Sequence, residues 1–294
     1  MSSPSPRQVI APPPQPPLPR RAGRLSAAQW CQWLQYYQTP DFIETDPIRY
    51  PHRFQRAGAD EACVELVAFL AAMFSYGNRQ AFFGVLDTLF DRLGEDPLAC
   101  LLNSTPSALS QRCQGVYYRF YTESDLAQVL WALRHVYLVY GSLKACWQQV
   151  VDNDSTDLSH QLCQFRQALL QPLQHAAMPS NGLRFFLADP AKGGTAKRWM
   201  MWLRWMVRHD AIDLGLWHDV MTPDRLAMPV DVHVLRTARY CRITTLKSPS
   251  WKLVQAITAY FRALNPADPV VYDFALFGLG QALAGVDAPH PDKD

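Results

Sequence analysis

Apolar side chains recur at intervals of three and four residues along nearly the whole chain from Leu25 onward. The stretch DLAQVLWALRHVYLVYG, which begins at Asp125, shows this spacing without a break. Such spacing places apolar side chains on one face of an α-helix. No alternating pattern typical of a β-strand continues beyond four residues. The sequence therefore predicts an all-α fold.

Local residues with known end preferences predict where the helices begin and end. Side chains that accept backbone N–H groups favour helix starts, as does proline in the first turn, and glycine favours helix ends. The expected starts lie at Ser26, Asp60, Ser124, Ser248–Pro249 and Asp268–Pro269, and the expected ends lie at Gly77 and Gly141.

The chain divides into one helical domain and two terminal segments. Residues 1–24 are rich in proline and lack an apolar pattern, which predicts a disordered or polyproline II tail. This tail is either a solvated extension or a docking segment for an SH3-like partner. We expect residues 25–286 to form the helical domain and residues 287–294 to form a short flexible tail.

Composition limits the class of protein. The net charge is only +2, so a DNA-binding surface would have to come from local clusters of basic residues. The seven cysteines form no C-x-x-C pair, which argues against a zinc or iron–sulfur site and favours reduced thiols in the cytoplasm. No apolar run approaches the roughly 18 residues of a membrane span. We expect a cytoplasmic protein without a metal.

The segment KGGTAKRWMMWLRWMVR combines a glycine pair with a basic helix. Gly193 and Gly194 permit a tight turn, and Thr195 is placed to cap the helix that follows. Exposed N–H groups at such a helix start favour a phosphate. The surrounding basic residues are Lys192, Lys197, Arg198, Arg204 and Arg208, with Trp199, Trp202 and Trp205 between them. The alternative is an ordinary loop followed by a solvated helix face.

A second segment, MPVDVHVLRTARY, places Asp231 at the expected start of a helix. Asp231 is either an N-cap or a catalytic carboxylate, and spacing does not choose between the two. The string PVDVHVLRTARY resembles the catalytic-aspartate segment of the helix-hairpin-helix (HhH-GPD) DNA glycosylase superfamily. That superfamily includes endonuclease III and the adenine and 8-oxoguanine glycosylases, and the 8-oxoguanine branch is the most similar.

This resemblance implies a fold of two packed helical subdomains with a cleft between them. It also implies that Asp231 stabilises positive charge on the sugar and that Lys197, in GGTAKRW, attacks C1′ to form a Schiff base. Lys197 could instead be one more phosphate contact. The residues expected to bind DNA are Asn78, Arg79, Gln80, Lys192, Gly193, Gly194, Thr195, Arg198, His233 and Arg236.

Other strings, including DPIRYPHRF, SYGNRQ and YDFALFGLG, resemble a bacterial branch of the same superfamily that is described as conserved proteins of unknown function. Two departures accompany the resemblance. AKGGTAK replaces the usual Leu-Pro-Gly-x-Gly hairpin, and the four-cysteine cluster of endonuclease III is missing. The resemblance therefore implies no iron–sulfur cofactor, and we expect no other cofactor.

The expected function is that of a DNA glycosylase, with an associated AP lyase activity, that acts on a flipped damaged base in double-stranded DNA. One alternative is a non-catalytic nucleic-acid-binding protein on the same fold. A second alternative is a metal-dependent phosphohydrolase built on the pair His209–Asp210, with His218, Asp219, Asp231 and His233 nearby in the sequence.

Overall fold

The computed structural model describes residues 14–19, 21–173 and 180–287. Within these ranges every regular secondary-structure element is a helix. Two isolated β-bridges, Tyr118–Tyr121 and His209–Leu214, are also present. The prediction of an all-α fold is therefore confirmed.

The α-helices are α1 (Ala27–Tyr37), α2 (Asp41–Thr45), α3 (Arg49–Arg56), α4 (Glu61–Phe74), α5 (Arg79–Leu93), α6 (Pro97–Asn103), α7 (Pro106–Cys113), α8 (Glu123–Tyr140), α9 (Leu143–Val150), α10 (Leu158–Leu170), α11 (Asn181–Phe186), α12 (Lys197–Val207), α13 (Val232–Tyr240), α14 (Trp251–Leu264) and α15 (Asp273–Asp287). Short 3-10 helices are η1 (Gln171–Leu173), η2 (Pro190–Lys192), η3 (Pro223–Arg225) and η4 (Pro269–Tyr272).

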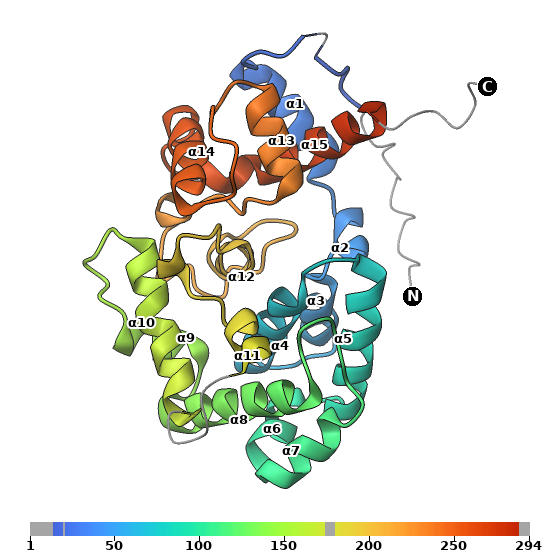
Figure 1. The fold of residues 1–294 in the computed structure, drawn as a ribbon, viewed down its shortest axis with the longest axis vertical. Helices are drawn as coiled ribbons and strands as arrows, with labels where there is room; N and C mark the ends of the chain where they lie inside the picture. The colour runs from blue at the N-terminus through green and yellow to red at the C-terminus, as the bar shows by residue number, and fades with distance from the viewer. Residues whose placement is uncertain (1–13, 20, 174–179, 288–294) are drawn as a thin grey trace, which may run out of the picture.

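The two ends of the helical domain pack together (Figure 1). Helix α1 lies against α15, and α15 also packs against α13, so the first helix joins a group formed by the last ones. Helices α3 to α11 form the other end of the molecule, and α12 lies between the two groups and contacts α4. Every side chain from Arg198 to Val207 in α12 is buried. Because α12 is buried between the two groups, its polar side chains need hydrogen-bond partners inside the protein.

Several predicted helix starts are confirmed by the capping contacts. The side chains of Ser26, Asp60 and Asp231 accept backbone N–H groups at the starts of α1, α4 and α13. Helix α8 begins earlier than predicted, because Thr122 and Asp125 exchange side-chain and backbone hydrogen bonds in a capping box.

One other predicted start is wrong, and one is confirmed in its position but not in its capping contact. Ser250, rather than Ser248–Pro249, caps α14. Asp268 begins the 3-10 helix η4 without a capping contact from its side chain. Its carboxylate instead accepts a hydrogen bond from Arg208 Nε at 2.9 Å. The tertiary ion pair replaces the local cap.

Part of the proline-rich N-terminal segment contacts the helical body. Leu18 packs against the core, and the Tyr240 hydroxyl donates a hydrogen bond to the Pro19 carbonyl at 2.7 Å. Residues 1–13 and 20 of the predicted N-terminal tail, and residues 288–294 of the predicted C-terminal tail, lie outside the described residues. None of the described helices combines the length and the apolar character that crossing a bilayer requires.

Candidate active site

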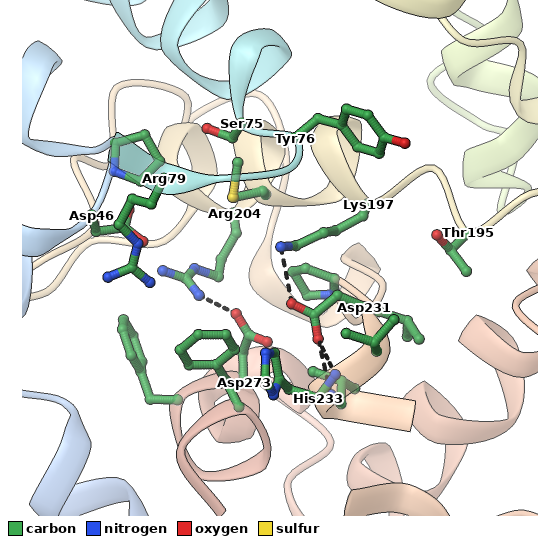
Figure 2. Close-up of a pocket in the computed structure, with 18 of the residues that line it drawn as sticks. Asp46, Ser75, Tyr76, Arg79, Thr195, Lys197, Arg204, Asp231, His233 and Asp273 are labelled. Atoms are coloured by element: carbon green, nitrogen blue, oxygen red, sulfur yellow. Dashed lines mark hydrogen bonds and ion pairs between the residues drawn. The ribbon is translucent and has the colours of Figure 1, made fainter. Parts of the chain in front are cut away.

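A pocket of about 620 Å³ lies where the two groups of helices meet (Figure 2). Its walls come from the connection between α2 and α3, the turn between α4 and α5, the first turns of α12 and α13, and helix α15. Charged residues in the walls are Asp46, Arg79, Lys197, Arg204, Asp231 and Asp273, together with His233. Aromatic rings of Phe42, Tyr76, Phe82, Trp205, Phe274 and Phe277 cover much of the remaining surface.

Lys197 and Asp231 meet in this pocket, as Figure 2 shows. The distance from Lys197 Nζ to Asp231 Oδ2 is 3.0 Å, and the two side chains are 34% and 16% exposed. Lys197 is the first residue of α12, and Asp231 precedes α13. The fold thus brings together the two residues that the sequence marked as a catalytic pair.

The two oxygens of Asp231 have different partners. Oδ1 accepts the backbone N–H groups of His233 and Val234, each at 2.9 Å, which is the N-cap contact. Oδ2 is directed toward Lys197. Cap and candidate catalyst are therefore compatible roles of one carboxylate, because each uses a separate oxygen.

The surroundings of Asp231 favour its ionised form. Burial raises the pKa of this carboxyl, but the positive charge of Lys197 and the N–H group of Val234 lower it, and the net pKa is below the ordinary value. The pocket therefore presents a carboxylate anion next to the amine at neutral pH.

The start of α12 differs from the predicted cap. Ala196 precedes the helix with a φ of 48°, no side chain caps the first turn, and Thr195 lines the pocket instead. Lys192, Gly193 and Gly194 are exposed. Gly193 has a φ of 78°, and its carbonyl accepts the N–H group of Trp251 at 2.8 Å. The glycine turn thus connects α12 to the start of α14.

The turn between α4 and α5 is arranged around Asn78. Its side chain accepts the N–H group of Ala81 at 3.0 Å and so caps α5. Asn78 and Gln80 are exposed, whereas Arg79 is half-buried and lines the pocket. Of these three predicted DNA contacts, Arg79 is the one in the pocket wall.

The basic face predicted for α12 is wrong. Arg198 is buried, and its guanidinium donates to the carbonyls of Met73 and Phe185 and to the Tyr121 hydroxyl. Arg204 and Arg208 are also buried and pair with aspartates. Because α12 is the central helix, its arginines need internal partners and are not available to an external phosphate.

The three tryptophans of α12 lie in different surroundings. Trp199 and Trp202 are buried in the core, where Trp199 Nε1 donates to the Ala188 carbonyl at 2.9 Å. Trp205 lines the pocket, as does Tyr76. Trp205 is therefore the tryptophan of α12 that lines the pocket.

Two further carboxylates of the pocket were not identified as site residues from the sequence. Asp46 belongs to DPIRYPHRF and Asp273 to YDFALFGLG, both strings that carried the resemblance. Both line the pocket. Burial raises the pKa of each, against the opposing charge of Arg204.

The two residues predicted beyond Asp231 lie on α13. His233 lines the pocket, and its ring meets Phe277 edge-on with centroids 5.4 Å apart. Arg236 is exposed, and its guanidinium is 3.4 Å from the Gly280 carbonyl. His233 is therefore placed to contact a ligand in the pocket, and Arg236 lies outside it.

The His/Asp residues of the predicted phosphohydrolase site make separate contacts. Asp210 accepts hydrogen bonds from Gln38 and from backbone N–H groups, and Asp219 pairs with Lys144. Among the described residues, no three His, Cys, Asp or Glu side chains gather closely enough to hold a metal ion. The arrangement lends that alternative no support.

A family model described as "Protein of unknown function (DUF2400)" matches residues 46–282. The chain belongs to this family. The DUF2400 segment contains every residue of the pocket wall except Phe42. Comparison with curated proteins and with solved structures found no match.

The DUF2400 pocket thus combines an amine, an ionised carboxylate and a wall of aromatic rings. An amine can attack an electrophilic carbon, and an adjacent carboxylate can stabilise positive charge that develops there. The aromatic rings can hold a planar ligand by stacking. The pocket can therefore hold a planar group beside a carbon that develops positive charge.

Proposed function

We propose that this protein is a DNA base-excision glycosylase with an associated AP lyase activity, built on a helix-hairpin-helix glycosylase-like fold. The observation that carries the proposal is the 3.0 Å contact between Lys197 and Asp231 in the wall of a pocket large enough for a base. Lys197 begins α12 and Asp231 precedes α13, so the tertiary fold brings the starts of these two helices together. The substrate is an extruded damaged base in double-stranded DNA.

In the proposed reaction, Asp231 stabilises the positive charge that develops at C1′ as the glycosidic bond breaks. The electron pair of that bond leaves with the base, which takes up a proton. The Lys197 amine forms the new bond to C1′, loses a proton, and opens the sugar ring to give a Schiff base. Water then takes a proton from C2′, a C2′–C3′ double bond forms, and the C3′–O bond breaks as the 3′ phosphate leaves with its electron pair. Hydrolysis of the Schiff base releases Lys197.

The Lys197–Asp231 ion pair requires a proton transfer before the amine can attack. Only the neutral amine is a nucleophile, so Lys197 passes a proton to water or to the departing base before its bond forms. Asp231 is a weak base because its pKa is lowered, and it remains the negative charge of the site. Binding DNA between the two residues would separate the pair.

Exposed groups around the pocket support a DNA contact. The first turn of α12 has no capping side chain, and the adjacent Gly193–Gly194 turn and Lys192 are exposed. Free N–H groups at a helix start attract a phosphate. In this proposal, the exposed Asn78 and Gln80 side chains fill the gap that the extruded base leaves.

The test of the lysine is borohydride trapping on duplexes that contain 8-oxoguanine, hypoxanthine, uracil, thymine glycol or an abasic site. We expect the wild-type protein to form a covalent adduct and to cleave the strand, and Lys197→Gln to do neither. Lys252→Gln, which changes an exposed lysine on α14, is the matched control and should retain both activities. An adduct that persists in Lys197→Gln would show that another amine attacks.

The same duplexes test the binding alternative. Duplex binding without base release or strand cleavage in the wild-type protein would support a non-catalytic DNA-binding protein. Release of a base by the wild-type protein and its loss in Asp231→Asn would support the glycosylase.

A further inference from the structure

Two charged residues of the pocket have no charged partner. Lys197 pairs with Asp231, and Arg204 pairs with Asp273. Arg79 and Asp46 remain, and in the described part of the chain neither forms an ion pair or a hydrogen bond to another side chain. One hydrogen bond to Asp46 is present, from the Ile48 N–H group to Oδ1 at 3.1 Å.

Arg79 and Asp46 share one side of the pocket, as Figure 2 shows. Arg79 is the first residue of α5, and Asp46 lies between α2 and α3. Burial raises the pKa of Asp46 overall, and the charges of Arg204 and Arg79 oppose that rise. The pocket wall therefore presents a cationic donor and a carboxyl acceptor next to each other.

Both groups are half-buried among aromatic rings. Phe42, Phe82 and Phe274 line the same pocket and provide apolar surfaces for a flat ligand. A charged group that is withdrawn from water is costly unless hydrogen bonds replace its hydration. An aromatic heterocycle with polar atoms along one edge would stack on the rings and form hydrogen bonds with the two charged groups.

We propose, on the basis of the glycosylase function above, that Arg79 and Asp46 select extruded bases that carry a ring N–H group beside a carbonyl. This lactam edge is shared by hypoxanthine, uracil and guanine-derived bases.

The chemistry of the two side chains accounts for the choice. Arg79 only donates hydrogen bonds, and a carbonyl oxygen has two lone pairs with which to receive its forked N–H groups. A carboxyl oxygen of Asp46 accepts hydrogen bonds, and the neighbouring ring N–H group is the donor. Adenine has no carbonyl, and the ring nitrogen of cytosine beside the amino group is an acceptor. Neither base matches the pair in this way.

Matched substrates isolate the ring N–H group. Rates of base release are compared for uracil and 3-methyluracil, and for hypoxanthine and 1-methylhypoxanthine, each opposite the same mismatched base. Methylation removes the ring donor and keeps the carbonyl. We expect the wild-type protein to release the parent base roughly 10- to 100-fold faster than its methylated partner, the range typical of one specific base contact.

Variants then assign this selectivity to the pair. Asp46→Asn retains an oxygen for the Ile48 N–H group but replaces the other acceptor with a donor, so the rate ratio should fall about tenfold. Arg79→Gln should slow the release of the parent bases by a similar factor. Arg56→Gln, a surface change on α3, should keep the wild-type ratio.

Trapping on an abasic duplex separates this inference from the glycosylase proposal, because that substrate has no base to select. Asp46→Asn and Arg79→Gln should trap on the abasic duplex nearly as well as the wild-type protein. Any factor by which trapping falls should be at least about tenfold smaller than the factor by which base release falls. A wild-type ratio near one, or an unchanged ratio in Asp46→Asn, would overturn the inference and leave the glycosylase intact. Absence of base release from every duplex by the wild-type protein would overturn both.

Discussion

At the residue scale, Asp231 connects local structure to the proposed chemistry. One of its oxygens caps the N-terminus of α13, and the other pairs with Lys197 from a distant part of the chain. Asparagine can retain the cap but not the negative charge, whereas alanine retains neither. The two substitutions therefore separate the structural role from the catalytic one.

We predict that Asp231→Ala lowers the free energy of unfolding by about 1 kcal/mol, the ordinary value of an N-cap. Asp231→Asn should cost less, because asparagine caps helices as well as aspartate. Both variants should lose base release, because neither supplies an anion at C1′. Urea denaturation and single-turnover assays measure the two effects, and an active Asp231→Asn protein would contradict the proposed role of the charge.

The lowered pKa of Asp231 gives a second prediction. Because the folded pKa lies below the unfolded value of about 3.9, the ionised carboxyl contributes stability that is fully present above that pH. This contribution disappears as the pH falls through the lower folded pKa. The difference in unfolding free energy between wild type and Asp231→Asn should therefore be constant from pH 5 to 7 and change below about pH 4. Urea titrations across this range measure it.

At the element scale, the position of α13 depends on close packing against α15. A Cβ atom added at Gly280 would clash with the His233 carbonyl oxygen, which belongs to the backbone of α13. The Thr237 hydroxyl donates to the Leu276 carbonyl at 2.7 Å across the same contact. Helix α13 can therefore approach as closely as it does only because residue 280 has no side chain.

We predict that Gly280→Ala displaces α13, separates Asp231 from Lys197, and reduces base release at least about tenfold without changing a pocket side chain chemically. Gly285→Ala is the matched control on the same helix, because an added Cβ there meets no atom within 4 Å. It should retain activity. Equal activity of Gly280→Ala and Gly285→Ala would show that this packing does not position the site.

At the scale of the whole molecule, buried ion pairs connect the central helix to the segments on either side of it. Asp213 is completely buried and accepts hydrogen bonds from both Arg204 and Arg208. Arg204 also reaches Asp273 at the start of α15, and Arg208 reaches Asp268 before η4. The pocket wall at Arg204 and Asp273 is thus part of a network that spans α12 and the C-terminal helices.

We predict that Asp213→Asn lowers the free energy of unfolding by about 3–5 kcal/mol, because it removes the negative charge that two buried guanidinium groups share. Glu44→Gln removes a carboxylate from a surface pair with Arg56 and should change stability by less than about 1 kcal/mol. Chemical denaturation of both variants measures the difference. Similar midpoints for the two would mean that the network contributes little.

Much of the fold, and one part of the site, could be predicted from local patterns. The spacing of apolar residues predicted the helices, and single polar residues such as Ser26, Asp60 and Asp231 predicted helix starts. The pairing of Lys197 with Asp231 could be anticipated only through family resemblance, because no local rule relates two residues so far apart in the chain. The predicted cap at Thr195 is wrong because Ala196 stands before the helix in a left-handed conformation and Thr195 lines the pocket. The predicted basic face of α12 is wrong because its arginines are buried.

The sequence by itself determined the helices, because helix formation depends on neighbours three and four residues away and on residues at the ends. The tertiary structure alone decided which side chains meet. Packing buried Arg198, Arg204 and Arg208, which in sequence resemble surface residues, and it placed Asp46 beside Arg79. Such contacts depend on how whole helices pack against one another, and that arrangement results from the sum of many apolar contacts rather than from any one segment.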